Sequence, residues 1–127
     1  MLHYLLIAAG GALGASARFA LSGAVQRAAG AEFPLGTLAV NVLGCAGIGL
    51  LGGLASGSEG LREELRLFAA IGFLGGFTTF STFGYETFLL LGARSVGPAL
   101  ANLALGNALC LAAVWAGFRV GARSAGG

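Results

Sequence analysis

The sequence contains no lysine and no aspartate. Its charged side chains are seven arginines and five glutamates in 127 residues, so that only 9% of the chain is charged and the net charge is +2. Soluble domains carry about 25% charged residues, and nucleic-acid-binding domains gather many basic side chains on one face. The composition therefore argues against both classes and indicates a protein that lies in a lipid bilayer.

Side chains suited to acid–base chemistry are equally rare. His3 is the only histidine, and without lysine or aspartate few groups remain that could transfer a proton. Cys45 and Cys110 each lie inside an apolar stretch, so we interpret them as free thiols that fill space, not as a disulfide or a metal-binding pair. We expect no catalytic residues, and the protein is not predicted to be an enzyme.

Long apolar segments dominate what is present. Hydrophobic residues make up 57% of the chain, the mean hydropathy is +0.88, and segments of low charge cover residues 2–25, 35–54, 67–91 and 95–118. Each has the roughly 20 residues that a helix needs to cross a bilayer, where a helix satisfies its own backbone hydrogen bonds. We therefore predict an all-α membrane protein: a single domain over residues 1–127 with four transmembrane helices, located in the plasma (inner) membrane.

Glycine is abundant, with 24 residues and no collagen-type repeat. Pairs of glycines four positions apart allow helix backbones to approach closely, and they predict tight packing between the spans. The pairs are Gly10/Gly14, Gly49/Gly53, Gly72/Gly76 and Gly117/Gly121.

The arginines are divided almost evenly between the two ends of the predicted helices. Four spans place both termini on the same side as the 57–66 loop, and the arginines on that side are Arg62, Arg66, Arg119 and Arg123. Those on the other side are Arg27, Arg94 and, near its helix end, Arg18. Because the more positive side tends to stay in the cytoplasm, so small a difference permits insertion in either orientation.

Several polar side chains fall within the predicted spans. A charge near the bilayer centre costs at least about 2.5–3.5 kcal/mol, so Arg18 and Glu86 are expected to face a cavity or a partner unless they reach the interface from a helix end. Asn41 lies near the middle of the second span, with Thr37 one turn earlier on the same face.

The fourth span carries its own polar positions. Asn102, Gly106 and Cys110 share one helix face, whereas Asn107 is expected to point elsewhere. A lone asparagine in a membrane helix most often makes an interhelical hydrogen bond. Asn41 and Asn102, together with the polar third span, indicate a polar path instead.

The third span contains the stretch FLGGFTTFSTFGYE, residues 73–86. If the span covers residues 67–91, its centre is residue 79, so two glycines and two threonines lie near the middle of the bilayer. Glycine and β-branched threonine favour an interruption of the helix there, which would release backbone carbonyls. Phe80 and Phe83 share a face just beyond it. The alternative is a continuous helix with packing phenyl rings and hydroxyls bonded back to the helix.

Three motifs together resemble the Fluc (CrcB) family of small fluoride ion channels, and the resemblance covers essentially the whole chain. They are GGALGASARF in the first span, GTLAVNVLGC in the second and GFLGGFTTFSTF in the third. The resemblance implies passive fluoride efflux that lowers cytoplasmic fluoride toxicity. It also implies an antiparallel, dual-topology homodimer with two pores and a third helix broken at the midplane.

The resemblance further implies site residues. A structural Na⁺ at the dimer centre would be held by backbone carbonyls of Gly75 and Thr78. The fluoride path would involve Asn41 as a donor and the rings of Phe80 and Phe83. Ser81 and Thr82 would lie near the path, Arg18 would line or shape an aqueous vestibule, and Thr37 and Glu86 would be further polar neighbours. We also assign Asn102 to the fluoride path, as the polar residue on the matching face of the fourth span.

The chain departs from the family pattern in its fourth span. Members of the family usually carry a tyrosine followed by hydroxyl residues at one-turn spacing, whereas the matching face here has Asn102, Gly106 and Cys110. Either Asn102 and water replace that track, or conduction differs in this half of the pore.

Two other functions remain open from the sequence. A small dual-topology exporter of cationic drugs also has four helices, but it needs a membrane-embedded carboxylate early in the chain, and here only Glu86 could serve. A non-conducting assembly subunit is favoured only by the glycine pairs. Passive fluoride efflux from loaded liposomes would separate all three.

Overall fold

The computed structural model describes residues 1–57 and 61–126. In this part of the chain the elements are α1 (Leu2–Ala29), α2 (Leu35–Ala55), α3 (Glu63–Leu65), the π-helical segment η1 (Arg66–Leu74), α4 (Gly75–Phe77), α5 (Phe80–Gly92) and α6 (Val96–Ala125). Four helical stretches, with α3 to α5 taken as one, are long and apolar enough to cross a membrane. The predicted all-helical fold with four spans is confirmed.

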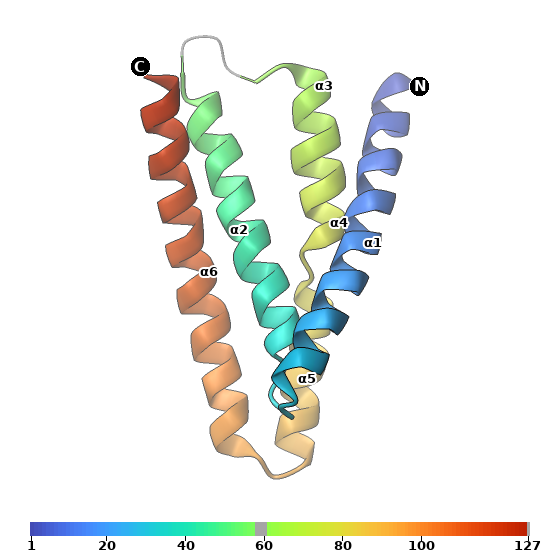
Figure 1. Ribbon diagram of the computed structural model, residues 1–127, viewed down its shortest axis with the longest axis vertical. Helices are drawn as coiled ribbons and strands as arrows, with labels where there is room; N and C mark the ends of the chain where they lie inside the picture. The colour runs from blue at the N-terminus through green and yellow to red at the C-terminus, as the bar shows by residue number, and fades with distance from the viewer. Residues whose placement is uncertain (58–60, 127) are drawn as a thin grey trace.

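The spans form two pairs (Figure 1). Helix α2 packs mainly on α6, and α1 packs mainly on η1 and α4 of the third span. Met1 and the end of α6 lie at the same end of the molecule as the last turn of α2 and the start of α3. At this end the His3 imidazole of α1 lies 3.8 Å from the Glu63 carboxylate of α3.

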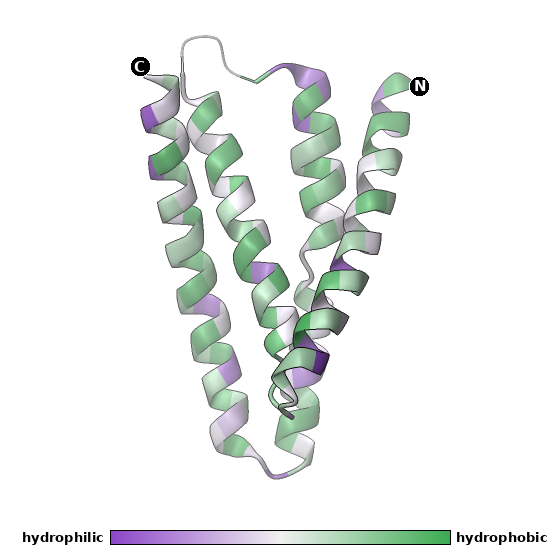
Figure 2. Ribbon diagram, in the orientation of Figure 1, coloured by the Kyte–Doolittle hydropathy of each residue, from purple (hydrophilic) through white to green (hydrophobic). Residues whose placement is uncertain are grey.

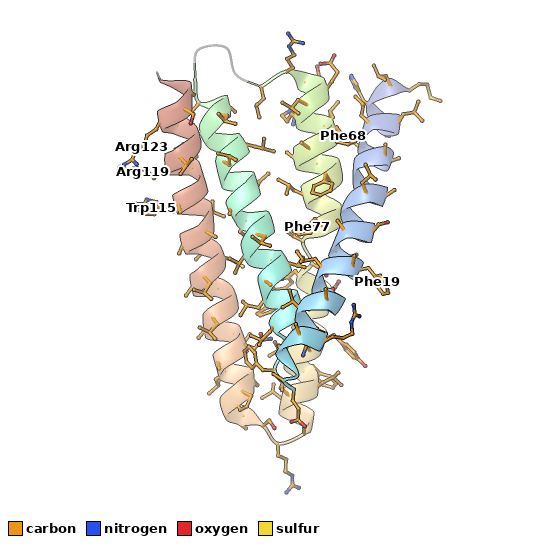
Figure 3. The ribbon with its side chains drawn as sticks, viewed as in Figure 1. Phe19, Phe68, Phe77, Trp115, Arg119 and Arg123 are labelled. Carbon is orange, nitrogen blue, oxygen red and sulfur yellow. The ribbon has the colours of Figure 1, made fainter. Side chains whose placement is uncertain are left out.

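The surface has the character expected of a membrane protein. Hydrophobic residues follow all four spans along their length, and only isolated hydrophilic residues interrupt them (Figure 2). Near the end of α6, Trp115, Arg119 and Arg123 project away from the other helices (Figure 3), with the Arg119 guanidinium 5.6 Å from the Trp115 ring centre. Helices α1 and α6 extend beyond the predicted spans 2–25 and 95–118, because a helix continues past the apolar core that limits the span.

Glycines bring α1 and the third span into backbone contact. A Cβ at Gly10 would collide with the carbonyl oxygen of Phe68, and one at Gly14 with that of Phe73. From the other side, a Cβ at Gly76 would lie 2.6 Å from the carbonyl oxygen of Gly11. Only glycine allows two helices to approach this closely, which confirms the predicted packing role of this set of pairs.

The same device joins α2 to α6. A Cβ at Gly49 would collide with the carbonyl oxygen of Val114, and one at Gly53 with that of Phe118. A Cβ at Gly117 would in turn meet the carbonyl oxygen of Ala46. The two backbones therefore come close over several turns, and a shift that placed any other residue at these glycine positions would cause a collision.

A single side chain organises the turn between α1 and α2. Gly30 ends α1 in the left-handed conformation, with φ 58°, and donates its amide to the Gln26 carbonyl. The Gln26 amide group donates to the carbonyls of Ala31 and Phe33 at 2.6 and 3.1 Å, and its oxygen accepts from the Gly36 amide at 3.0 Å. Gln26 thus satisfies backbone groups that the turn leaves without helical partners.

Gly117→Ala should destabilise the protein, because the added methyl group collides with the α2 backbone and cannot be accommodated by a rotamer change. We expect a loss of about 1–3 kcal/mol, the usual range for overpacking, seen as a lower temperature of aggregation in detergent. Gly97→Ala in the same helix is the matched control, because a Cβ there meets nothing within 4 Å. Equal stability of the two variants would show that the close approach is not needed.

Candidate functional site

The third span is interrupted between α4 and α5. Thr78 has φ −80° and ψ 157°, and Thr79 has φ −152° and ψ 116°, so both residues have extended backbone. Asn41 of α2 pairs with the backbone of Thr79: its Nδ2 donates to the Thr79 carbonyl at 2.9 Å, and its Oδ1 accepts from the Thr79 amide at 2.8 Å. The Asn41 side chain therefore replaces the helical hydrogen bond that the Thr79 amide has lost, and adds a second hydrogen bond to the Thr79 carbonyl.

Thr79 also begins α5. Its Oγ1 accepts from the Thr82 amide at 3.2 Å, donates to Thr82 Oγ1 at 3.1 Å and lies 3.3 Å from Ser81 Oγ. A threonine hydroxyl in this position is a regular N-cap. The sequence does not carry the usual cap signature here, because the residue three positions after Thr79 is Thr82 and not glutamate or glutamine.

These hydrogen bonds redirect two backbone amides. In a continuous helix the Thr79 amide would donate to the Gly75 carbonyl, and the Thr82 amide would donate to the Thr78 carbonyl. Here the first donates to Asn41 and the second to the Thr79 hydroxyl. Gly75 and Thr78 are the two residues whose carbonyls were predicted to bind a cation.

A cavity of about 420 Å³ adjoins the interruption, between α2, the third span and α6. Its polar and aromatic wall residues are Asn41, Cys45, Thr78, Thr79, Phe80, Phe83, Asn107 and Cys110. Gly44 admits the Thr78 side chain to this wall, since a Cβ at Gly44 would collide with Thr78 Cγ2. We refer to this space as the central cavity.

Two phenyl rings border the central cavity in different ways. The centres of the Phe80 and Phe83 rings are 5.6 Å apart and their planes are tilted by 45°. Phe83 is 8% exposed and packs against Gly106 of α6, where a Cβ would lie 2.6 Å from the ring. Phe80 is 80% exposed within one chain. The cavity wall therefore contains one fixed ring and one ring that lies on the surface of the chain.

A second cavity, of about 440 Å³, lies on the other side of Asn41 along α2 and reaches the turn between α1 and α2. Thr37, Thr82 and Glu86 line it, and the Thr37 hydroxyl donates to Glu86 Oε1 at 2.7 Å. Glu86 Oε2 is buried and has no hydrogen-bond partner among the described residues. We refer to this space as the lateral cavity.

Asn102 lies behind the phenyl rings. It is 1% exposed and donates to Thr87 Oγ1 at 2.9 Å, and the Thr87 hydroxyl donates to the Phe83 carbonyl at 2.8 Å. These two hydrogen bonds connect α6 to α5, the helix that carries Phe83. Among the described residues that line the central cavity the fourth span contributes Gly106, Asn107, Cys110 and Leu111, without Asn102.

Two expectations from the sequence need correction. Asn107 was expected to point away from the polar face of α6, but it lies in the wall of the central cavity, because a cavity at a helix contact accepts residues from a wider arc than one helical stripe. Cys45 and Cys110 are free thiols, as expected, but they lie in the same cavity wall, near enough to interact.

The remaining predicted site residues differ in where they lie. Gly75 lines the central cavity and is exposed, as is Ser81 near the cap of α5. Arg18 is half-buried on α1 and is absent from the walls of both cavities as far as the chain is described. Within one chain, Asn41, Phe80 and Phe83 therefore come together at one cavity, and Thr37, Thr82 and Glu86 at the other.

Comparison with known proteins places these features in a family. The family model described as "CrcB-like protein, Camphor Resistance (CrcB)" matches residues 5–118. A protein of Geobacter sulfurreducens named "Fluoride-specific ion channel FluC" is 51% identical over 117 residues, which cover 92% of this chain and 94% of that protein.

Other relatives with the same printed name are similarly close. The protein of Thermus thermophilus is 48% identical over 95% of this chain and 96% of its own length. The protein of Methylobacillus flagellatus is 44% identical over 94% of each. The residues that the family model matches include most of each of the four spans.

Proposed function

The chain belongs to the CrcB-like family, and from this membership we propose that it is a fluoride-specific ion channel that lets fluoride leave the cell passively and so lowers its toxicity. The main support for this function is the identity of 44–51% to relatives named as fluoride-specific channels, over almost their full length. The protein is a multi-pass membrane protein and not an enzyme. The drug-exporter alternative is not favoured.

We propose that fluoride passes between the two cavities at Asn41. Fluoride binds its hydration water tightly, so a pore has to offer other donors in place of that water. Asn41 uses one amide hydrogen for the Thr79 carbonyl, and an asparagine amide has a second hydrogen to offer. The hydroxyls of Ser81 and Thr82 are further donors on the same turn of α5.

The phenyl rings suit the central cavity for the same reason. The edge of a phenyl ring carries positive partial charge, so it attracts an anion weakly. Weak binding favours conduction because the ion must also leave. The fixed ring of Phe83 and the surface ring of Phe80 are therefore the proposed lining of the path.

We propose that the lateral cavity is a water-filled vestibule. Thr37 and Glu86 are its polar neighbours, and Glu86 is already held by a hydrogen bond from Thr37. Arg18 lies outside both cavity walls in one chain, so its proposed contribution to a vestibule depends on a second chain. Asn102 has a different proposed task, which is to hold Phe83 through Thr87.

We propose that the interruption lies at the middle of the bilayer and binds Na⁺. Carbonyl oxygens are hard ligands suited to Na⁺. Gly75 and Thr78 offer such oxygens, because the amides that would otherwise take them donate to Asn41 and Thr79. A bound cation would supply positive charge that lowers the energy of an anion nearby.

We propose that two chains of opposite orientation form the channel. The axis relating two antiparallel copies lies in the membrane plane, so only residues at the midplane meet their own copies. Two interruptions facing each other would contribute about four carbonyl oxygens to one cation. The almost even distribution of arginines supports insertion in both orientations.

The phenyl rings give the first test. Purified protein in liposomes loaded with fluoride should release it through a passive pathway. Phe80→Ile and Phe83→Ile keep an apolar side chain but remove the ring edge, so each should slow the initial efflux roughly three- to tenfold, the effect of losing about 0.5–1.5 kcal/mol of ring interaction. Phe19→Ile, on the exposed surface of α1, is the matched control. Wild-type rates in both variants, with the oligomer intact, would show that the rings only pack.

Asn41→Asp tests the proposed donor. Aspartate still accepts from the Thr79 amide, but it loses the donor and adds negative charge beside the path. Efflux should fall by about a hundredfold or more, because two like charges ~4 Å apart repel by about 4 kcal/mol in a partly buried site. Ser124→Asp, on the exposed end of α6, should conduct normally. Undiminished flux at neutral pH through the Asn41 variant would contradict the role.

Accessibility of one introduced cysteine tests the dual topology. In a background without Cys45 and Cys110, Arg62→Cys lies at the end with the termini and Glu32→Cys at the opposite end, both exposed. A membrane-impermeant maleimide added outside intact cells should label about half of each population, because half of the molecules face each way. Labelling of only one of the two variants would overturn dual topology and the shared cation site with it.

A further inference from the structure

The two cysteines of the chain lie in the wall of the central cavity. Cys45 comes from α2 and Cys110 from α6, both are half-buried free thiols, and both line the central cavity. The two thiols are near enough to interact with each other. The fluoride path proposed above uses neither side chain.

The glycine contacts explain why the thiols meet. Helices α2 and α6 run in the same direction, since both end at the side of the molecule that holds the C-terminus (Figure 1). Gly49 abuts the backbone at Val114, and Gly53 abuts it at Phe118 four residues further along. One turn before Gly49 and Val114, the same register places Cys45 opposite Cys110.

This register holds the pair in place. A Cβ at Gly49 or Gly117 would strike the facing backbone, so the helices have no room to slide past one another. A binding site on rigid elements needs little reorganisation when its ligand arrives. The two thiols are therefore a preorganised pair and not two independent side chains.

The chemistry of the pair selects its ligand. No group of three or more histidine, cysteine, aspartate or glutamate side chains that could hold a metal is found in the residues that the structure describes. Structural zinc needs four such ligands. Soft closed-shell cations such as copper(I) and silver(I) prefer thiolates and are satisfied by two of them in a linear arrangement.

We propose that Cys45 and Cys110 form a two-thiolate site for copper(I)-type soft cations, and that an occupied site closes the central cavity to fluoride. Binding of one monovalent cation releases the two thiol protons, so the product carries one net negative charge. That charge stands in the same wall as Phe80 and Phe83 and repels an anion. The closing effect rests on the proposed channel function, whereas the metal site does not.

Silver(I) is the probe, because it has the coordination preference of copper(I) without its redox chemistry. The purified protein is titrated with silver nitrate in chloride-free detergent buffer, following thiolate-to-metal absorption in the ultraviolet. The Cys45→Ser/Cys110→Ser double variant measures binding elsewhere, for example at Met1 and His3. We expect one additional Ag⁺ per chain in the wild type, lost or greatly weakened in either single Cys→Ser variant.

Fluoride efflux from liposomes is measured on the same four proteins. In the wild type, Ag⁺ should slow efflux by roughly tenfold or more, the effect of one unit charge within ~10 Å at an effective dielectric of ~20, and excess dithiothreitol should restore it. The double variant should conduct and ignore Ag⁺.

Each arm has its own contradicting result. No additional Ag⁺ in the wild type, or equal binding by a single-cysteine variant, would overturn the paired site even if the protein conducts fluoride. Binding without any slowing would overturn the closing effect. Absence of fluoride efflux without Ag⁺ would contradict the channel function, while the titration would still decide the metal site.

Discussion

The structure depends on one constraint, that backbone amides and carbonyls within hydrocarbon must find partners in the protein. In most of the chain, uninterrupted helix provides these hydrogen-bond partners. At Thr78 and Thr79 the helix stops, and Asn41 takes over both polar groups of the Thr79 peptide edge. An unpartnered buried group would cost about 1–3 kcal/mol, so without Asn41 the interruption would be hard to sustain.

The same pairing changes which amides the carbonyls of Gly75 and Thr78 can accept from. The Thr79 amide donates to Asn41 and the Thr82 amide to the Thr79 hydroxyl, so neither amide donates to the carbonyl four residues before it. The donor side of the site and the proposed cation site are thus two consequences of one rearrangement of hydrogen bonds. An anion path beside a cation-binding backbone is electrostatically consistent, since each charge lowers the energy of the other.

Two glycines determine which side chains reach the wall of the central cavity. Gly44 and Gly106 each leave room for one side chain, Thr78 and Phe83, at the wall of the central cavity. Buried behind that wall, Asn102 and Thr87 hold the backbone that carries Phe83. Asn102, which the sequence analysis placed at the path, therefore has a supporting role in one chain, and the asparagine of the fourth span that lines the cavity wall is Asn107. Small residues and interhelical hydrogen bonds, and not apolar burial, therefore determine which helix faces pack together.

Composition and the regular spacing of residues were the features from which the sequence predicted the fold. Scarce charge and four apolar segments were enough for an all-helical protein with four spans, because hydrocarbon leaves the backbone few alternatives. Glycine pairs four residues apart predicted close packing for the same geometric reason, and three motifs were enough to indicate the family. Which helix receives each glycine face, that Asn41 pairs with Thr79, and that Cys45 meets Cys110 were decided only by the tertiary structure. Helical periodicity specifies the face of a side chain but not the register of the neighbouring helix, and these contacts depend on that register.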